Sequence, residues 1–192
     1  TPVPSAVCPP PKITGLSCSK QAVNVWNDVM SLNRPVLLEI VTKDKFAAAA
    51  LVLAFGDATA LTWTRQGILE VPLGELADSW TGGVQYLWQA PQGWIGSVGL
   101  GNTSPVVNVI AQMFATLDGM AAPNVASFGP ALEARVRLFQ ESEGIAADGV
   151  VGEQTILRLN DRLGIGLTSQ RALERSSMWL TQVSAAGGYP RG

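Results

Sequence analysis

The spacing of hydrophobic positions changes near residue 100. Before it, short apolar runs separated by turn residues predict strands. These strands cover residues 36–41, 48–55, 58–64, 68–71 and 84–89. Gly56-Asp57 is a hairpin signal, helical spacing predicts a helix over 19–32 that Ser19 can cap, and 72–80 should form one or two helical turns. We therefore expect an α+β first half with an antiparallel or mixed sheet.

Beyond the glycine-rich joint at 93–102, apolar residues recur at the helical period. They predict helices over 105–117, 130–143 and 152–163, and more weakly over 169–183. The three stronger helices end at Gly119, Gly144 and Gly164, which can adopt a positive φ. The predicted organisation is a Pro-rich linker (1–15), an α+β domain (16–100), a three-helix domain (101–166) and a tail that packs back on the first domain (167–192).

Composition excludes several kinds of chemistry. The chain has 192 residues, a net charge of −2 and no histidine. A Ser-His-Asp triad, a Cys-His pair and a histidine-ligated zinc site are therefore unavailable, and two cysteines are too few for an all-cysteine zinc site. The balanced charge argues against a nucleic-acid partner. We expect no catalytic residue, no metal and no cofactor.

Two features concern the cellular compartment. Cys8 and Cys18 lie close together and would form a disulfide in an oxidising compartment, the alternative being two reduced cytosolic thiols. The longest apolar stretch, 46–55, is about half of a membrane span. The Pro-rich start and the absence of an initial methionine suggest a piece of a longer protein, without a signal peptide in this part.

A motif in the second half carries the functional signal. Residues 132–163 contain Val-x-x-Phe-Gln, then Asp-Gly, then Val-Gly-x-x-Thr leading into a helix with a buried leucine. This segment resembles the type 1 peptidoglycan-binding domain. The matching positions are Val136, Phe139, Gln140, Gly144, Asp148, Gly149, Gly152, Thr155 and Leu159. Most have a structural interpretation, since Phe139 belongs in a core and Asp148-Gly149 in a turn.

Polar side chains beside the apolar stripes are the candidate contacts. At about 100° per residue, the positions that flank the stripes are Arg135, Gln140, Thr155, Asn160 and Arg162. Arginine suits the carboxylates of cell-wall stem peptides, while Gln140 and Asn160 suit sugar and amide groups. The alternative is a set of salt pairs on the helix surface. Arg137 and Arg158 should point away into solvent.

The first half is similar, more weakly, to the family C39 cysteine-peptidase (papain-like) fold. The similarity lies in Arg34–Ile40, the strand pair after it, and the segments Val71–Leu73, Trp80–Gly83 and Leu87–Pro91. Alanines at 47–50 occupy the place of the catalytic histidine, and Cys18, roughly where a nucleophile could be, has no base. The resemblance implies a peptidase-like scaffold without catalytic residues.

The tandem of these two domains resembles the periplasmic region of the general secretion pathway protein A family. That resemblance implies a parent protein anchored in the inner membrane, with a cytoplasmic ATPase module. It also implies work with general secretion pathway protein B on assembly of the type II secretion secretin, peptidoglycan as a partner, and a homo-oligomer. No Walker A loop occurs here, so this region should not hydrolyse ATP.

Three functions are therefore in competition. The first is non-catalytic binding of peptidoglycan. The second is a peptidoglycan or peptide hydrolase that uses Cys18 or paired carboxylates such as Glu75 and Asp78. The third is a protein-interaction scaffold that does not bind the cell wall.

Overall fold

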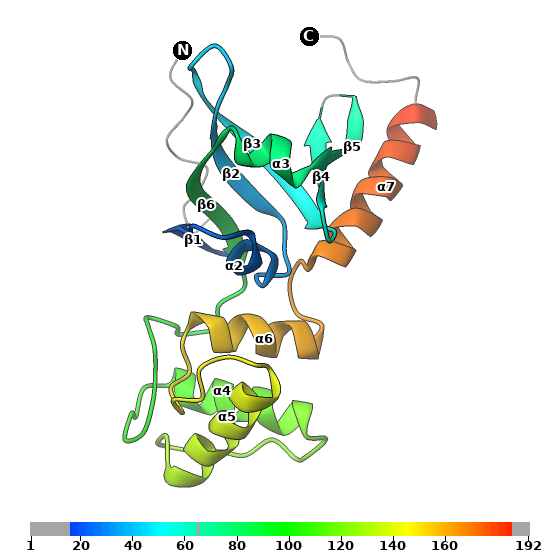
Figure 1. Ribbon diagram of the computed structural model, residues 1–192. Helices are drawn as coiled ribbons and strands as arrows, with labels where there is room; N and C mark the ends of the chain where they lie inside the picture. Colours follow the sequence, from blue (N-terminus) through cyan, green and yellow to red (C-terminus); the bar gives the residue numbers. More distant parts are fainter. Residues whose placement is uncertain (1–15, 65, 186–192) are drawn as a thin grey trace. The chain divides into compact units, whose positions relative to one another are not determined.

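The computed structural model describes residues 16–64 and 66–185, shown in Figure 1. These residues form two compact units. The sheet unit contains the described residues through Trp88 and those from Leu167 on, and the helical unit contains Gln89–Gly166. The predicted α+β class with a separate helical part is confirmed.

Six strands of the sheet unit form one antiparallel sheet in the order β1-β6-β2-β3-β4-β5. The strands are β1 (Ser17–Ala22), β2 (Val36–Val41), β3 (Ala47–Phe55), β4 (Thr59–Thr64), β5 (Gly67–Pro72) and β6 (Trp80–Trp88). The predictions for β2 to β5 hold to within a residue or two. β6 begins earlier than its predicted start at residue 84, because Trp80 already pairs with Ile40 of β2.

The core of the sheet unit lies along β2 and its two neighbours. Val36 stands opposite Val52 on one side and Tyr86 on the other, and all three are buried. α2 (Trp26–Met30) packs against β6 through a stack of Trp26 on Trp80, with ring centroids 4.4 Å apart. The short helix α3 (Leu73–Ala77) follows β5, and α7 (Ser169–Ala185) packs on β3.

The helix predicted over residues 19–32 is wrong. Residues 17–22 form the edge strand β1, paired with β6, and only the single turn of α2 is helical. Ser19 does not cap a helix, because its hydroxyl accepts a hydrogen bond from Trp88 Nε1 at 2.9 Å. The backbone groups of β6 need a partner strand on this side, and that tertiary requirement overrides the local helical spacing.

Cys18 lies within β1, opposite Leu87 and before the first helix of the sheet unit. It is disulfide-bonded, whereas Cys8, the partner that the sequence predicts, lies outside the described residues. A sulfur held in a disulfide is not a thiolate and cannot act as a nucleophile. No described helix is long and apolar enough to cross a bilayer.

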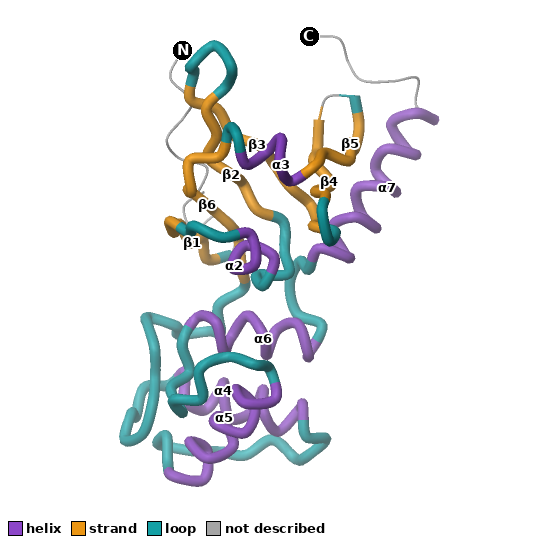
Figure 2. Tube along the Cα trace, viewed as in Figure 1, coloured by secondary structure: helices purple, strands orange, loops and turns teal. Residues whose placement is uncertain are grey.

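Three helices make up most of the helical unit: α4 (Val106–Leu117), α5 (Pro130–Ser142) and α6 (Glu153–Leu163), as Figure 2 shows. The predicted glycine ends are confirmed, since Gly119, Gly144 and Gly164 have φ values of 65°, 66° and 67°. The Phe114 and Phe139 rings meet edge to face, with centroids 5.4 Å apart.

Residues 89–100 group with the helical unit, so its boundary differs from the predicted one at 100/101. Val98 and Val151 are buried opposite each other and exchange backbone hydrogen bonds of 3.1 and 2.8 Å. This glycine-rich segment has no regular apolar period, and only tertiary pairing places it. The tail groups with the sheet unit through α7.

The fully buried position of Leu38 in β2 gives a test of the sheet core. Leu38→Ala should lower the free energy of unfolding by about 2–5 kcal/mol, because it removes buried methyl groups and leaves a cavity. Leu69→Ala, at a β5 position that is 44% exposed, should change it by less than about 1 kcal/mol. Urea unfolding followed by tryptophan fluorescence compares the two, and equal losses would contradict this core assignment.

Candidate functional site

The side-chain amide of Gln140 lies at the centre of the motif. It extends from α5, is 1% exposed and uses both ends of its amide. Oε1 accepts a hydrogen bond from the Gly149 backbone N–H at 2.8 Å. Nε2 donates to Asp148 Oδ1 and the Val150 carbonyl at 2.9 Å, and to Thr155 Oγ1 at 3.1 Å. One buried amide thus joins α5, the turn 147–150 and the first turn of α6.

The Asp148 carboxylate closes this turn from the other side. Its Oδ1 accepts a hydrogen bond from the Val150 N–H at 2.8 Å, the predicted bond of an aspartate to a following backbone amide. This bond is the main cause that lowers the pKa of Asp148 below its usual value, and the bond from Gln140 adds to it. Gly149 has φ +75°, and a Cβ there would lie 2.8 Å from Glu133 Cγ. Glycine is therefore required on both conformational and steric grounds.

Arg137 is exposed, as the helical spacing predicted, and it also holds the outer side of the same turn. Its Nη1 donates to the Ala147 carbonyl at 2.7 Å and its Nη2 to Glu133 Oε1 at 2.9 Å. The Glu133–Arg137 spacing of four residues was the available signal for the ion pair. The contact with Ala147 depends on the path of the turn, which the sequence does not specify.

Arg135 lies at the surface and is engaged by a carboxylate of the same chain. Its Nε and Nη2 donate to the two oxygens of Asp118 at 2.8 and 2.6 Å, and its guanidinium lies 5.1 Å from the centroid of the Phe114 ring. This two-point pairing lowers the pKa of Asp118 and raises that of Arg135. Arg135 thus connects α5 to the C-terminal end of α4.

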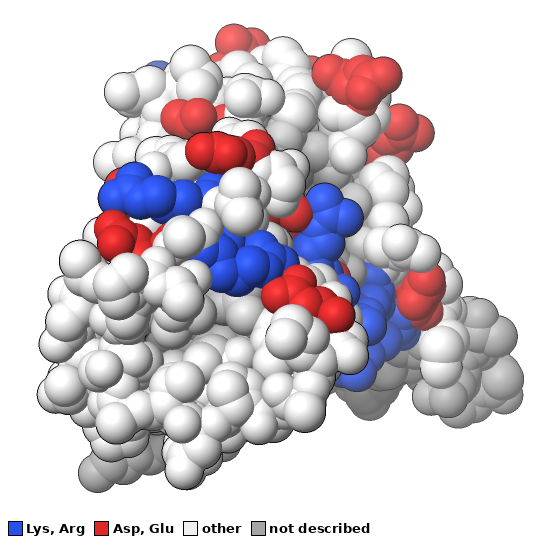
Figure 3. All heavy atoms as spheres, turned by 90° about the horizontal axis from the view of Figure 1, so that it is seen from below, with Lys and Arg blue, Asp and Glu red and all other residues white. Residues whose placement is uncertain are grey.

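The remaining candidates lie on α6. Thr155 and Asn160 are each 2% exposed, and Asn160 Nδ2 donates to the Gln89 carbonyl at 2.8 Å. Arg162 is at the surface, where its Nε donates to Glu143 Oε1 at 2.6 Å. Figure 3 shows that basic and acidic side chains lie close to one another on the face in view.

The structure therefore divides the five candidate residues into two groups. Gln140, Thr155 and Asn160 lie inside the helical unit, not at its surface beside the apolar stripes. The helical spacing alone does not show that the turn 147–150 folds over Gln140 and Thr155. Arg135 and Arg162 are at the surface, each with one carboxylate partner.

The carboxylates considered for hydrolysis, Glu75 and Asp78, are exposed in and directly after the short helix α3. Among the described residues, no group of three His, Cys, Asp or Glu side chains could hold a metal ion.

The helical unit matches a known class of domain. Residues 107–159 match the family model described as "Putative peptidoglycan binding domain". The match includes α5, the turn 147–150 and most of α6, and so contains the hydrogen-bonded unit around Gln140. The resemblance seen in residues 132–163 is confirmed.

The chain as a whole is similar to general secretion pathway protein A of Aeromonas hydrophila. The two are 23% identical over 164 residues, which cover 85% of this chain and 30% of that protein. This chain therefore corresponds to about a third of the relative's length. The resemblance to this family is confirmed at that level.

Two solved structures are also similar to this chain. A periplasmic domain of the EpsAB fusion protein of the Vibrio vulnificus type II secretion system has a TM-score of 0.57 and 23% identity, covering 83% of this chain and 69% of that chain. It shares the fold. The N-terminal peptidase C39 like domain of the toxin secretion ATP-binding protein from Vibrio parahaemolyticus has a TM-score of 0.33 and 17% identity, covering 40% of this chain and 61% of that chain.

The buried amide of Gln140 gives a test of the site's framework. Gln140→Ala should lower the free energy of unfolding by roughly 2–4 kcal/mol, because it leaves the Gly149 N–H and the Val150 carbonyl without this partner. Gln154→Ala, at an exposed position of α6, is the matched control and should change stability by less than about 0.5 kcal/mol. Thermal unfolding distinguishes them, and a Gln140 variant as stable as the control would contradict the assigned role.

The lowered pKa of Asp148 predicts a pH dependence. A carboxyl whose folded pKa is depressed stabilises the fold above its unfolded pKa of about 4, and this contribution is lost as the pH falls through the folded value. Asp148→Asn should keep the turn yet lose less stability than the parent between about pH 5 and pH 2. The control is Glu141→Gln, since Glu141 is exposed on α5. If Asp148→Asn and the parent show the same acid dependence in thermal unfolding, the carboxylate does not have this role.

Proposed function

We propose that this protein binds peptidoglycan without cleaving it, through its helical unit. The observation that carries the proposal is the family match at residues 107–159. Its Gln140, Asp148 and Thr155 positions form one internally satisfied unit. Such a unit fixes the turn 147–150 rigidly between two helices, and a rigid surface loses little conformational entropy when it binds a ligand.

Surface arginines are the proposed contacts. Arg135 pairs with Asp118 through Nε and Nη2 and so leaves Nη1 available, and Arg162 pairs with Glu143 through Nε. The remaining guanidinium N–H groups can donate to a carboxylate or a carbonyl of the cell wall. Gln140, Thr155 and Asn160 contribute by holding the backbone that presents this surface, since their own polar atoms are buried and bonded within the unit.

The proposed setting is the periplasm, as part of a type II secretion assembly. The names of the similar proteins support this setting: one is a general secretion pathway protein A, and the other is a periplasmic domain of a type II secretion system. By the same similarity we propose a membrane-anchored parent protein with a cytoplasmic ATPase module. General secretion pathway protein B is its partner, homo-oligomerisation accompanies its work, and secretin assembly is its role.

The absence of catalysis is part of the proposal. No histidine is available as a general base, and Cys18 is held in a disulfide. Glu75 and Asp78 lie at the surface, in and directly after the short helix α3. A hydrolase therefore lacks an activated nucleophile. The scaffold alternative, which needs no wall binding, is decided by the experiment below.

Sedimentation with purified sacculi tests this function. The full chain should sediment with the sacculi and stay in the supernatant with cellulose particles of equal mass. Prolonged incubation should release neither new reducing ends nor new amino groups from the sacculi. A chain that remains in the supernatant with sacculi would favour the scaffold, and release of either product would favour the hydrolase.

A further inference from the structure

The arginines of the helical unit are not equivalent. Residues 89–166 contain seven carboxylates and no lysine. Their four cations are Arg135, Arg137, Arg158 and Arg162. Three of these form ion pairs with carboxylates: Arg135 with Asp118, Arg137 with Glu133, and Arg162 with Glu143.

Arg158 differs from the other three. Within the described part of the chain, its side chain makes no hydrogen bond, ion pair or ring contact. The unit has more carboxylates than arginines, so a shortage of acidic partners does not account for this. Arg158 is half-buried, and none of its guanidinium N–H donors is bonded within the described residues, so a ligand that reaches the side chain can use them.

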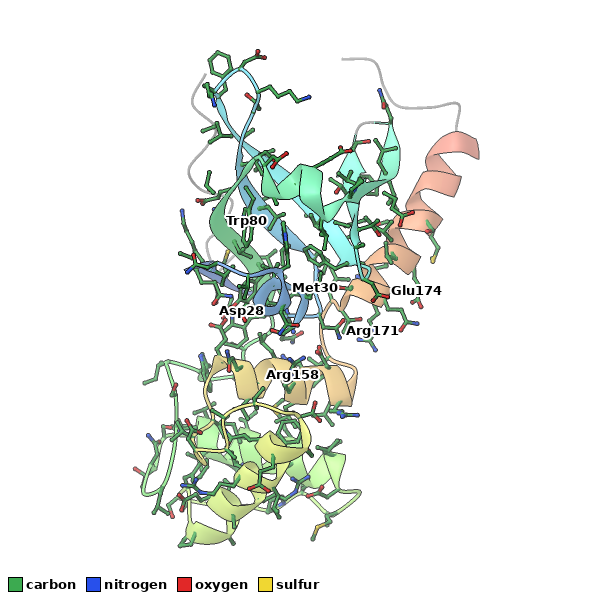
Figure 4. All side chains as sticks on the ribbon, viewed as in Figure 1. Asp28, Met30, Trp80, Arg158, Arg171 and Glu174 are labelled. Carbon is green, nitrogen blue, oxygen red and sulfur yellow. The ribbon has the colours of Figure 1, made fainter. Side chains whose placement is uncertain are left out.

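The position of Arg158 suits an external ligand. The residues around it in sequence, Ile156, Leu157, Leu159 and Asn160, are buried, while Arg158 itself lies on the opposite side of the helix. Figure 4 shows it on the side of α6 away from α4 and α5. Arg162 follows one turn later, a spacing that places the two Cβ atoms about 6 Å apart. Arg162 pairs with Glu143 through its Nε and not through its two Nη groups.

We propose that Arg158 binds a carboxylate of the peptidoglycan stem peptide, with the free Nη groups of Arg162 beside it. This assignment rests on the proposed function and names the part of the wall that is recognised. A guanidinium binds a carboxylate through two parallel hydrogen bonds, whereas sugar hydroxyls offer no such matching charge. Since the unit carries excess negative charge, this attraction is local and salt screens it.

Affinity for sacculi should therefore depend on Arg158. Arg158→Ala should weaken binding at least tenfold, which corresponds to about 1.4 kcal/mol. Arg158→Lys should bind with intermediate affinity, because lysine keeps the positive charge but cannot donate two parallel hydrogen bonds to one carboxylate. Arg175→Ala, at an exposed position of α7, removes the same charge elsewhere and should bind like the parent. Unchanged thermal unfolding of all variants shows that they remain folded.

The ligand is tested on the same chain with two preparations of the wall. One is intact sacculi, and the other is glycan strands from which an amidase has removed the stem peptides and on which the lactyl carboxylates exposed by that cleavage have been converted to amides. The parent should bind the peptide-free glycan at least tenfold more weakly, and Arg158→Ala should show little further loss on that material. Added salt should weaken the parent's binding to intact sacculi more than that of Arg158→Ala.

The outcomes separate the two proposals. Arg158→Ala binding as tightly as the parent, or parent binding to glycan strands as tight as to sacculi, would overturn the assignment of Arg158 and leave wall binding intact. A parent chain that fails to bind intact sacculi would overturn the proposed function and this inference together.

Discussion

The helical unit depends on the satisfaction of one buried amide. Gln140 reaches from α5 into the interior, where each end of its side chain needs a partner. The turn 147–150 supplies those partners through the Gly149 N–H, the Val150 carbonyl and the Asp148 carboxylate, and Thr155 adds a fourth. Moving the turn away leaves the amide oxygen without the Gly149 N–H, its one donor in the described residues, and removes two of the three acceptors of Nε2, so α5, the turn and α6 are fixed as a unit.

This dependence explains why the motif is informative and yet mostly internal. Phe139, Gln140, Gly149 and Thr155 are inside the helical unit. The spacing of these residues is set by the packing of the fold. The ligand contacts are made by surface residues that this packing positions. Arg137 on the outside and Gln140 on the inside hold the same turn from opposite sides. A binding surface built on so constrained a turn is pre-organised.

Prediction from sequence succeeded where local chemistry decides the structure. The helix ends at Gly119, Gly144 and Gly164 and the Asp148 turn follow from conformational preference alone. It failed at residues 17–22, where pairing with β6 prevails over helical spacing. The sequence prediction also expected Gln140, Thr155 and Asn160 at the surface, whereas all three are buried. The helical spacing does not show which loop covers a helix. Arg137 is exposed as expected, but its hydrogen bond to the turn was not predicted, because it depends on the same loop path.

The central claim is that the helical unit presents a wall-binding surface on a rigid turn and α6. Backbone amide NMR during titration of the full chain with soluble stem-peptide-bearing wall fragments tests it most directly. The account predicts concentration-dependent shift changes along α6 and the turn 147–150, with the sheet unit's β2 and β3 amides unchanged. Shift changes confined to the sheet unit, or none at saturating fragment, would contradict it.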